Sequence, residues 1–466
     1  MMNFKSYIVA SLLLVVQIAS FAQQKFEHRG YLGWMIDMSR TECHDAWPAV
    51  KLDSAMIADY AETLDFLQRS RMNEITLWGL FTNKYWEPEV EKTIDSNRKL
   101  MIDKVIRIAH QRKIKVILGM GVYSWGFDKI LQEHPELGCS CNPHVLDWSN
   151  LKSWDWQKKV FDYTIDNFDF DGISMQSADL GRCNCGELAK MTDLEYHAAI
   201  NHRAVKYIRS KKPHYIIGIS GWGMNFGNPA DLNSIQMMTK EVDYLIDVEE
   251  TSLKEGRKYR QELIKAIAPC CFGNTAVPNI EPIQRMPRNA YFVPTLFHAC
   301  KNLKDLFADG GLACETYART RGNPGDKVTI EVIAKILSNP ELDINKALSE
   351  VLKTEYQPID HAALLELSTI FQEAEEAFFT NTRKIGMNDF CKDILLLIPR
   401  DGQGIDENYL KNMEPISRET YKNTINDLQG RVLKLNGKVK NQDELNLLYS
   451  CLTRVFNQIT PIKLSK

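Results

Sequence analysis

The sequence predicts an α/β protein, a (β/α)₈ barrel of the TIM type followed by an all-helical C-terminal domain. Up to about Ala318, short runs rich in Val, Ile and Leu alternate with amphipathic segments, as in a parallel sheet covered by helices. About eight such units over roughly 290 residues fit a closed barrel better than an open sheet. No Gly-rich phosphate-binding fingerprint follows the first run, which argues against a doubly wound nucleotide-binding sheet.

Seven expected strands are short apolar runs, at Tyr31–Asp37, Glu74–Leu80, Lys115–Met120, Asp171–Gln176, Tyr215–Ser220, Asp243–Glu249 and Gly311–Glu315. The eighth lies at Pro269–Gly273 or at Ala290–Thr295, and the pattern does not distinguish the two. The segments between them predict helices at Asp53–Met72, Asn97–Arg112, Trp154–Phe168, Asp193–Ser210 and Glu255–Ala266. Asp53 and Asp193 stand where N-caps are expected.

After Ala318 the periodicity becomes helical only. The expected helices are Lys327–Ser338, Ile344–Lys353, Ala362–Thr382, Arg418–Lys434 and Asp443–Phe456. All nine tryptophans lie at or before Trp222, so the two parts of the chain differ in kind. We therefore place the barrel at residues 23–320 and the helical domain at 321–466.

Residues 1–22 have the pattern of a signal peptide. Lys5 precedes an apolar run from Tyr7 to Ile18, and Ser20 and Ala22 supply the small residues that signal peptidase reads. The alternative is a membrane anchor, but the run is short for a span of ~20 residues. We expect cleavage before Gln23, export to the periplasm or the medium, and no membrane span in the mature chain.

The charge is nearly balanced, with 57 Lys and Arg against 60 Asp and Glu, so nothing indicates a nucleic-acid partner. The ten histidines are scattered and no H-E-x-x-H motif occurs. We therefore expect no catalytic metal and no other cofactor.

Two pairs among the eleven cysteines share the spacing C-x-C, Cys139 with Cys141 and Cys183 with Cys185. In an oxidising compartment they can form disulfides between the pairs, because a bridge within C-x-C would be strained. A four-thiolate zinc site and free thiols are the alternatives. The odd total leaves at least one thiol without an intramolecular partner.

In a (β/α)₈ barrel the active site lies at the C-terminal ends of the strands. Side chains alternate between the two faces of a strand. In the sixth strand, we expect the outward side chains, which face the helix layer, to be Tyr244, Ile246 and Val248. The inward set is then Leu245, Asp247 and Glu249, with Glu250 in the following loop. When two carboxyl groups share one confined site, the pKa of one rises while the other stays charged, which suits an acid and a base. The alternative is that Asp247 forms an ion pair lower in the barrel.

The last strand offers a second carboxylate. Leu312 and Cys314 form its outward set, so Glu315 points inward at the strand end and is a candidate base or nucleophile. Arg319 and Arg321 follow and could hold an acidic sugar through a bidentate contact. The alternative is a structural Glu–Arg ion pair.

The fourth strand ends at Gln176 and is followed by Asp179 and Arg182. Asp179 is a candidate acid, nucleophile or hydroxyl ligand, although Asp before Gly also caps turns. Gln176 and Arg182 are candidate substrate contacts. Glu281, in a polar segment, is a weaker candidate.

Four tryptophans fall near the ends of the first, second, third and fifth strands, namely Trp34, Trp78, Trp125 and Trp222. Sugar rings stack on aromatic rings through their C–H face, and the indole N–H can donate to hydroxyl groups. A single Trp at a strand end is usually core, but four at equivalent positions predict a substrate platform.

The exported barrel, the strand-end carboxylates and the helical tail resemble barrel glycoside hydrolases of polysaccharide-degrading bacteria, and in architecture the family 67 α-glucuronidases. That resemblance implies a catalytic Glu after the sixth strand, at Glu249 or Glu250 here, and a further carboxylate at Glu315. The stretch from Asp179 to Cys185 resembles a Cys-containing turn in some uncharacterised barrel families and in endo-acting N-glycan hydrolases. The Asp-Glu pair that β-hexosaminidases carry after the fourth strand is absent.

The sequence therefore predicts a glycoside hydrolase acting on a poly- or oligosaccharide, including one with acidic sugars, by carboxylate acid/base catalysis. A non-catalytic glycan-binding barrel would keep the tryptophans and use the carboxylates structurally. A polysaccharide lyase would need a base and a group that neutralises a carboxylate, such as Arg319 or Arg182.

Overall fold

The computed structural model describes residues 25–34, 52–81, 86–246, 256–276, 292–317, 323–382 and 415–459. Eight parallel strands in these ranges form a closed barrel in the order β1-β10-β9-β8-β7-β6-β3-β2. They are β1 (His28–Trp34), β2 (Glu74–Trp78), β3 (Lys115–Gly121), β6 (Gly172–Gln176), β7 (Ile216–Ser220), β8 (Tyr244–Ile246), β9 (Cys271–Ala276) and β10 (Ala313–Tyr317). The predicted barrel is confirmed, and the eighth strand is β9, which overlaps the first of the two ranges considered.

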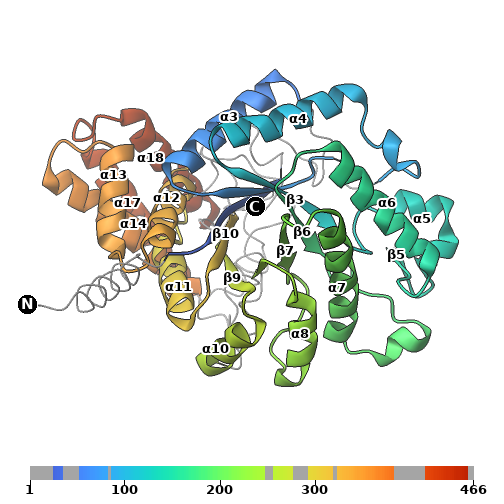
Figure 1. Cartoon of the computed structure of the whole chain (residues 1–466). Helices are drawn as coiled ribbons and strands as arrows, with labels where there is room; N and C mark the ends of the chain where they lie inside the picture. Colours follow the sequence, from blue (N-terminus) through green and yellow to red (C-terminus); the bar gives the residue numbers. More distant parts are fainter. Residues whose placement is uncertain are drawn as a thin grey trace, which may run out of the picture.

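Helices cover the outside of the barrel (Figure 1). They are α3 (Ser54–Arg69), α4 (Ser96–Gln111), α6 (Leu151–Asn167), α7 (Asp193–Lys211), α8 (Leu232–Thr239), α10 (Gly256–Ile267), α11 (Leu296–Asp309) and α12 (Pro324–Ser338). Asp53 caps α3 as expected, accepting from the N–H of Met56. The cap of α7 is Thr192 rather than Asp193, because Thr192 and Glu195 form a reciprocal capping box.

An insertion separates β3 from α6. It contains α5 (Asp128–Glu133) and an antiparallel hairpin of β4 (Gly138–Cys139) and β5 (Asn142–Leu146). A β-bridge between Ser124 and Val145 ties this hairpin to the chain just after β3. The hairpin is therefore held beside the C-terminal ends of the barrel strands, the end at which β3 and β6 finish.

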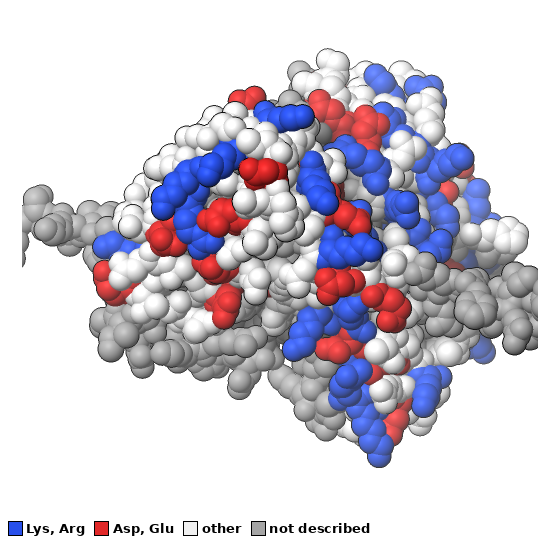
Figure 2. Space-filling model, turned by 90° about the vertical axis from the view of Figure 1, so that its left-hand side faces the viewer, with Lys and Arg blue, Asp and Glu red and all other residues white. Residues whose placement is uncertain are grey.

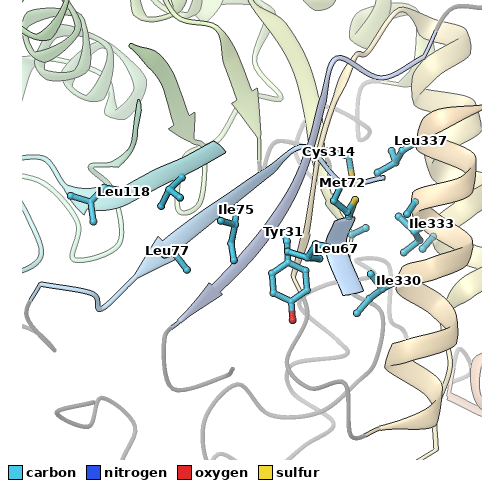
Figure 3. Close-up of a cluster of buried hydrophobic side chains, with 14 of the residues drawn as sticks. Tyr31, Leu67, Met72, Ile75, Leu77, Leu118, Cys314, Ile330, Ile333 and Leu337 are labelled. Atoms are coloured by element: carbon cyan, nitrogen blue, oxygen red, sulfur yellow. The ribbon is translucent and has the colours of Figure 1, made fainter. Parts of the chain in front are cut away.

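Helix α12 follows the last barrel strand and packs against α11. Ile330, Ile333 and Leu337 of α12 lie in one buried cluster with residues of the first strands and of α3, among them Tyr31 and Leu67 (Figure 3). This is the place of the eighth barrel helix, beyond residue 320, where the sequence pattern put the boundary.

Four more helices complete the described chain, α13 (Ile344–Glu355), α14 (His361–Thr382), α17 (Pro415–Lys434) and α18 (Gln442–Ile459). Each packs on its neighbour in the chain, and together they lie on one side of the barrel (Figure 1). Figure 2 faces that side and shows Lys and Arg interspersed with Asp and Glu. The predicted helical C-terminal region is confirmed.

The facing assigned to β8 was wrong. Tyr244 and Ile246 lie inside the barrel in a buried cluster with Cys271 and Ala313, whereas Leu245 belongs to the main core. The Tyr244 ring has room inside because Gly218 has no side chain, and a Cβ there would lie 2.3 Å from the ring. A glycine on the neighbouring strand thus accommodates the ring on the side opposite to the one that the apolar pattern suggested.

The expected signal peptide, residues 1–22, lies outside the described residues. Among the helices of the described ranges, none has the length and apolar character needed to cross a bilayer.

Candidate active site

The C-terminal ends of β6 and β7 bring together a carboxylate and an exposed indole. Asp179 follows β6 and Trp222 follows β7, and Trp222 Nε1 donates a hydrogen bond of 3.2 Å to Asp179 Oδ1. Trp222 is 45% exposed, so part of its ring is accessible. Loss of hydration raises the pKa of Asp179, while the bond from Trp222 acts in the opposite direction. A carboxyl group of raised pKa beside an accessible ring is a combination suited to sugar chemistry.

The turn after β7 fixes Trp222 against the loop after β6. Gly223 has a φ of +83°, a backbone conformation that residues with a side chain rarely adopt. A Cβ at Gly223 would lie 3.1 Å from the carbonyl oxygen of Ala178, the residue before Asp179. Close backbone approach at a glycine therefore holds the indole beside the carboxylate.

The loop after β3 is locked to the end of β6. Val122 N–H donates to the carbonyl of Gln176 at 2.8 Å, and the Ser124 hydroxyl donates to the carbonyl of Ser177 at 3.1 Å. Tyr123 and Trp125 both have a φ of about 59°, in the left-handed region. Backbone conformations of this kind cost free energy and concentrate at functional sites, which supports placing the site here.

Two of the four predicted tryptophans form an apolar floor rather than an exposed platform. The Trp78 and Trp125 rings meet edge to face at 5.6 Å and cluster with Leu32, with Leu180 packed against them. They are 6% and 7% exposed. Because both rings bury their faces against protein, Trp222 is the predicted tryptophan that these ranges leave open for stacking. The side chain of Trp34 lies outside the described residues.

Glu315 points into the barrel, as the strand alternation predicted. Its Oε1 accepts hydrogen bonds from Thr76 Oγ1 at 2.5 Å and from the Tyr244 hydroxyl at 3.2 Å, and the side chain is buried. Glu315 of β10 pairs in register with Gly30 of β1. Leu32, which belongs to the apolar floor, stands two residues beyond Gly30 on β1. Glu315 therefore lies one layer beneath the floor.

The other predicted catalytic and arginine positions are Asp247, Glu249, Glu250, Arg319, Arg321 and Glu281. All of them lie outside the described residues, so their roles remain predictions.

The guanidinium of Arg182, a predicted substrate contact, is engaged by the loop after β6, and its role toward a substrate remains a prediction. Its Nη1 donates to the Met191 carbonyl at 2.9 Å and its Nη2 to Asn184 at 3.1 Å. The group also stands 5.8 Å from the Tyr196 ring centroid. Arg182 holds the loop after β6 in shape.

Gln176, half-buried at the end of β6, lies on the same strand face as Ser174, whose hydroxyl bonds to Tyr244 inside the barrel.

A buried network that the sequence did not indicate supports the same loop. Ser177 Oγ lies 3.1 Å from His197 Nδ1, and the Asn201 side chain donates to Ser177 Oγ at 2.8 Å. Burial lowers the pKa of His197 to about 4, so the ring is neutral. Ser177 is buried, so a serine nucleophile is not accessible here, and the network positions Ala178 and Asp179. A Ser directly after a strand end carries no pattern that predicts this network.

One cross-pair disulfide joins the two C-x-C motifs, Cys139 with Cys183. Cys141 and Cys185 are thiols beside it. The predicted cross-pairing is thus confirmed for one bridge, which takes one cysteine from each motif, and the second possible bridge is not formed.

No family model matches the sequence, and no curated protein matches it either. Among solved structures, a GH138 enzyme targeting pectin rhamnogalacturonan II has a TM-score of 0.59 at 11% identity over 93% of this chain and 57% of that one. A mutant of the Thermobaculum terrenum O-GlcNAc hydrolase has 0.51 at 10% identity, covering 94% and 83%. CpGH84B has 0.51 at 9% identity, covering 93% and 67%.

At these identities the likeness shows a shared fold. This chain spans 57% of the length of the GH138 enzyme, so much of that protein has no counterpart here. A family 67 α-glucuronidase is not among these three structures, and that resemblance remains a prediction.

Proposed function

We propose that this protein is a glycoside hydrolase whose active site is the barrel mouth formed by the loops after β6, β7 and β8. The observation that carries the proposal is the contact between Asp179 and Trp222. Asp179 is the proposed general acid, because its raised pKa favours the protonated form that a departing sugar oxygen needs. Trp222 is the proposed stacking surface for a sugar ring.

Glycosidases commonly use a second carboxyl group across the scissile bond. We propose Glu249 or Glu250 for this role, because they stand three and four residues after the end of β8 in the sequence and β8 is the barrel neighbour of β7. Glu315 is less suited to touch substrate, since it is buried beneath the apolar floor and bonded to Thr76 and Tyr244.

The fold likeness to proteins described as glycan-active is consistent with this class of substrate. An acidic sugar is the finer proposal, resting on Arg319 and Arg321 after β10. Substrates worth testing first are therefore pectic oligosaccharides containing uronic acids and β-linked N-acetylglucosamine glycosides.

We also propose that the chain is exported to the periplasm or the medium after loss of residues 1–22. The composition of that segment is the support for it. N-terminal sequencing of the protein recovered from cell fractions should begin at Gln23. A mature protein retaining residues 1–22 would contradict the proposal.

The test of function is a panel of plant, algal and host glycans, with products separated and identified by mass spectrometry. A hydrolase adds one water to each bond that it cleaves. A lyase would instead give an unsaturated product that absorbs in the ultraviolet, and a binding protein would retain glycan without turnover. If no glycan in a broad panel is cleaved, the proposed activity is wrong.

A further inference from the structure

Four cysteine sulfurs meet between the β4–β5 hairpin and the loop after β6. The Sγ atoms of Cys139, Cys141, Cys183 and Cys185 all lie within 4.8 Å of one another. Besides its bond to Cys183, Cys139 Sγ lies 3.2 Å from Cys141 Sγ and 3.3 Å from Cys185 Sγ. Each C-x-C motif thus contributes two sulfurs to one compact cluster.

The size of the cluster suits a tetrahedral ion. Zinc–sulfur bonds of ~2.3 Å place the four sulfurs of a tetrahedral site about 3.8 Å apart. That spacing falls within the 4.8 Å limit that holds for every pair here. Once the Cys139–Cys183 bond is reduced, the four sulfurs are therefore close enough together to ligate one ion.

Polar hydrogens also point at the sulfurs. The backbone N–H of Asn184 donates to Cys141 Sγ at 3.1 Å, and Ser140 Oγ lies 3.1 Å from Cys185 Sγ. Such contacts stabilise the negative charge of metal-bound thiolates. Cys141 is exposed and Cys185 half-buried, whereas the remaining cysteines of the described ranges are buried: Cys270, Cys271, Cys300, Cys314 and Cys451. The cluster is thus the accessible thiol site of these ranges.

We propose that these four cysteines form a binding site for one thiophilic divalent cation of the zinc class. The cation-binding form is the reduced one, since a disulfide sulfur is not a thiolate ligand. A dithiol reductant delivers two electrons and two protons to the Cys139–Cys183 bond, which breaks to give two thiols, and the dithiol becomes its own cyclic disulfide. Binding then releases the thiol protons of all four cysteines to the solvent.

The site would fix the loop that carries Asp179. Asn142, in the hairpin, donates through Nδ2 to the Leu180 carbonyl at 2.9 Å, one residue past Asp179. The ion would add a second link between the same two segments, through Cys183 and Cys185. Its role is therefore structural, and its detection does not depend on any enzymatic activity.

The experiment titrates Co²⁺, a spectroscopic substitute for Zn²⁺, into dithiol-reduced full-length protein without oxygen. We expect one Co²⁺ per chain, with thiolate-to-cobalt charge-transfer bands that one equivalent of Zn²⁺ abolishes. Cys141→Ser and Cys185→Ser should each weaken binding more than about 100-fold. Cys271→Ser, in a buried cysteine of β9, is the matched control and should bind like the wild type.

The proposal is overturned if reduced protein that is folded by circular dichroism gives no charge-transfer band, or if Cys141→Ser binds Co²⁺ as well as Cys271→Ser does. Should the variants fail to fold, alkylation of the wild type decides. One equivalent of Zn²⁺ should protect the four cysteines of the cluster together. Unchanged alkylation, or a second disulfide between Cys141 and Cys185 that persists under the dithiol, would contradict the metal site.

Discussion

Two effects, a hydrogen bond and the loss of hydration, shift the pKa of Asp179 in opposite directions. Partial loss of hydration raises the pKa of this carboxyl group, and the indole N–H of Trp222 limits the rise by stabilising the charged form. The contact can therefore set the proton affinity of the carboxyl group while Trp222 stays 45% exposed.

Trp222→Phe keeps an aromatic ring and removes the N–H donor. We expect the pKa of Asp179 to rise further, because the charged carboxylate loses a hydrogen bond while its burial remains. The measurement is an NMR titration of the ¹³C-labelled aspartate carboxyl group. Trp156→Phe, on the outer helix α6, is the control and should leave this titration unchanged. A fall in the Asp179 pKa in Trp222→Phe would contradict the assigned role of the N–H.

For single residues, the sequence predicted where side chains lie better than it predicted what they contact. Strand-end placement alone was enough to nominate Asp179, Trp222 and the inward side chain of Glu315. It could not show that Arg182 is occupied by loop carbonyls, because those contacts arise from a turn without regular periodicity. Likewise the space that the Tyr244 ring fills inside the barrel is left by Gly218 of a neighbouring strand, a tertiary contact that no single segment contains.

At the scale of the elements, the barrel mouth is shaped by close packing on glycines. A Cβ at Gly119 of β3 would lie 2.3 Å from the Trp78 ring, so Trp78 occupies the space that a side chain there would fill. Gly430 of α17 is the opposite case, because a Cβ there meets nothing within 4 Å. One glycine is required by packing and the other is not.

Gly119→Ala should therefore destabilise the protein by about 1–3 kcal/mol, since the added methyl group must displace an indole in a filled interior. Gly430→Ala, the matched control, should stabilise it by up to ~1 kcal/mol by favouring the helical backbone. Urea unfolding followed by circular dichroism measures both. A Gly119→Ala protein as stable as the wild type would show that Trp78 is not packed as described.

The elements themselves were predicted well where their periodicity is long. The helices α3, α4, α7 and α14 were foreseen within a few residues, because amphipathic patterns of four or more turns are unambiguous. The β4–β5 hairpin was missed, since strands of two and five residues in a cysteine-containing loop give no measurable alternation.

At the scale of the whole molecule, α12 joins the barrel to the C-terminal helices. Its Glu331 is buried, and burial together with the nearby Glu355 carboxylate raises the pKa of Glu331 to about 7. Arg69 of α3 lies 3.5 Å from Glu331 across this contact but only partly offsets the effect. The interface therefore contains a carboxyl group that prefers to be protonated.

The consequence is a pH dependence of stability. Because the folded state binds this proton more tightly than the unfolded chain, the contribution of Glu331 is full below pH 4.5 and is lost as the pH rises to about 7. Glu331→Gln lacks this titration, so its stability relative to the wild type should improve across that window, on the order of 2 kcal/mol. Exposed Glu341→Gln should show no such trend in urea unfolding at several pH values. A constant difference between Glu331→Gln and the wild type would contradict the raised pKa.

The overall architecture followed from the sequence because eight strand–helix units leave few closed arrangements. The boundary at residue 320 stays a prediction, and α12, which begins after it, packs against α11 and shares a buried cluster with residues of β1 and α3. Its assignment to the barrel depends on which helices it touches, and that is a property of the folded molecule.

The central claim is that Asp179 at the mouth of this barrel takes part in glycoside hydrolysis. The most direct measurement is kcat/KM of Asp179→Asn on a glycan that the wild type cleaves, with thermal unfolding as a check of folding. We predict a loss of about 10²–10⁴-fold, while Glu187→Gln, an exposed carboxylate of the same loop, stays within about twofold. A folded Asp179→Asn protein that cleaves the glycan at the wild-type rate would contradict the account.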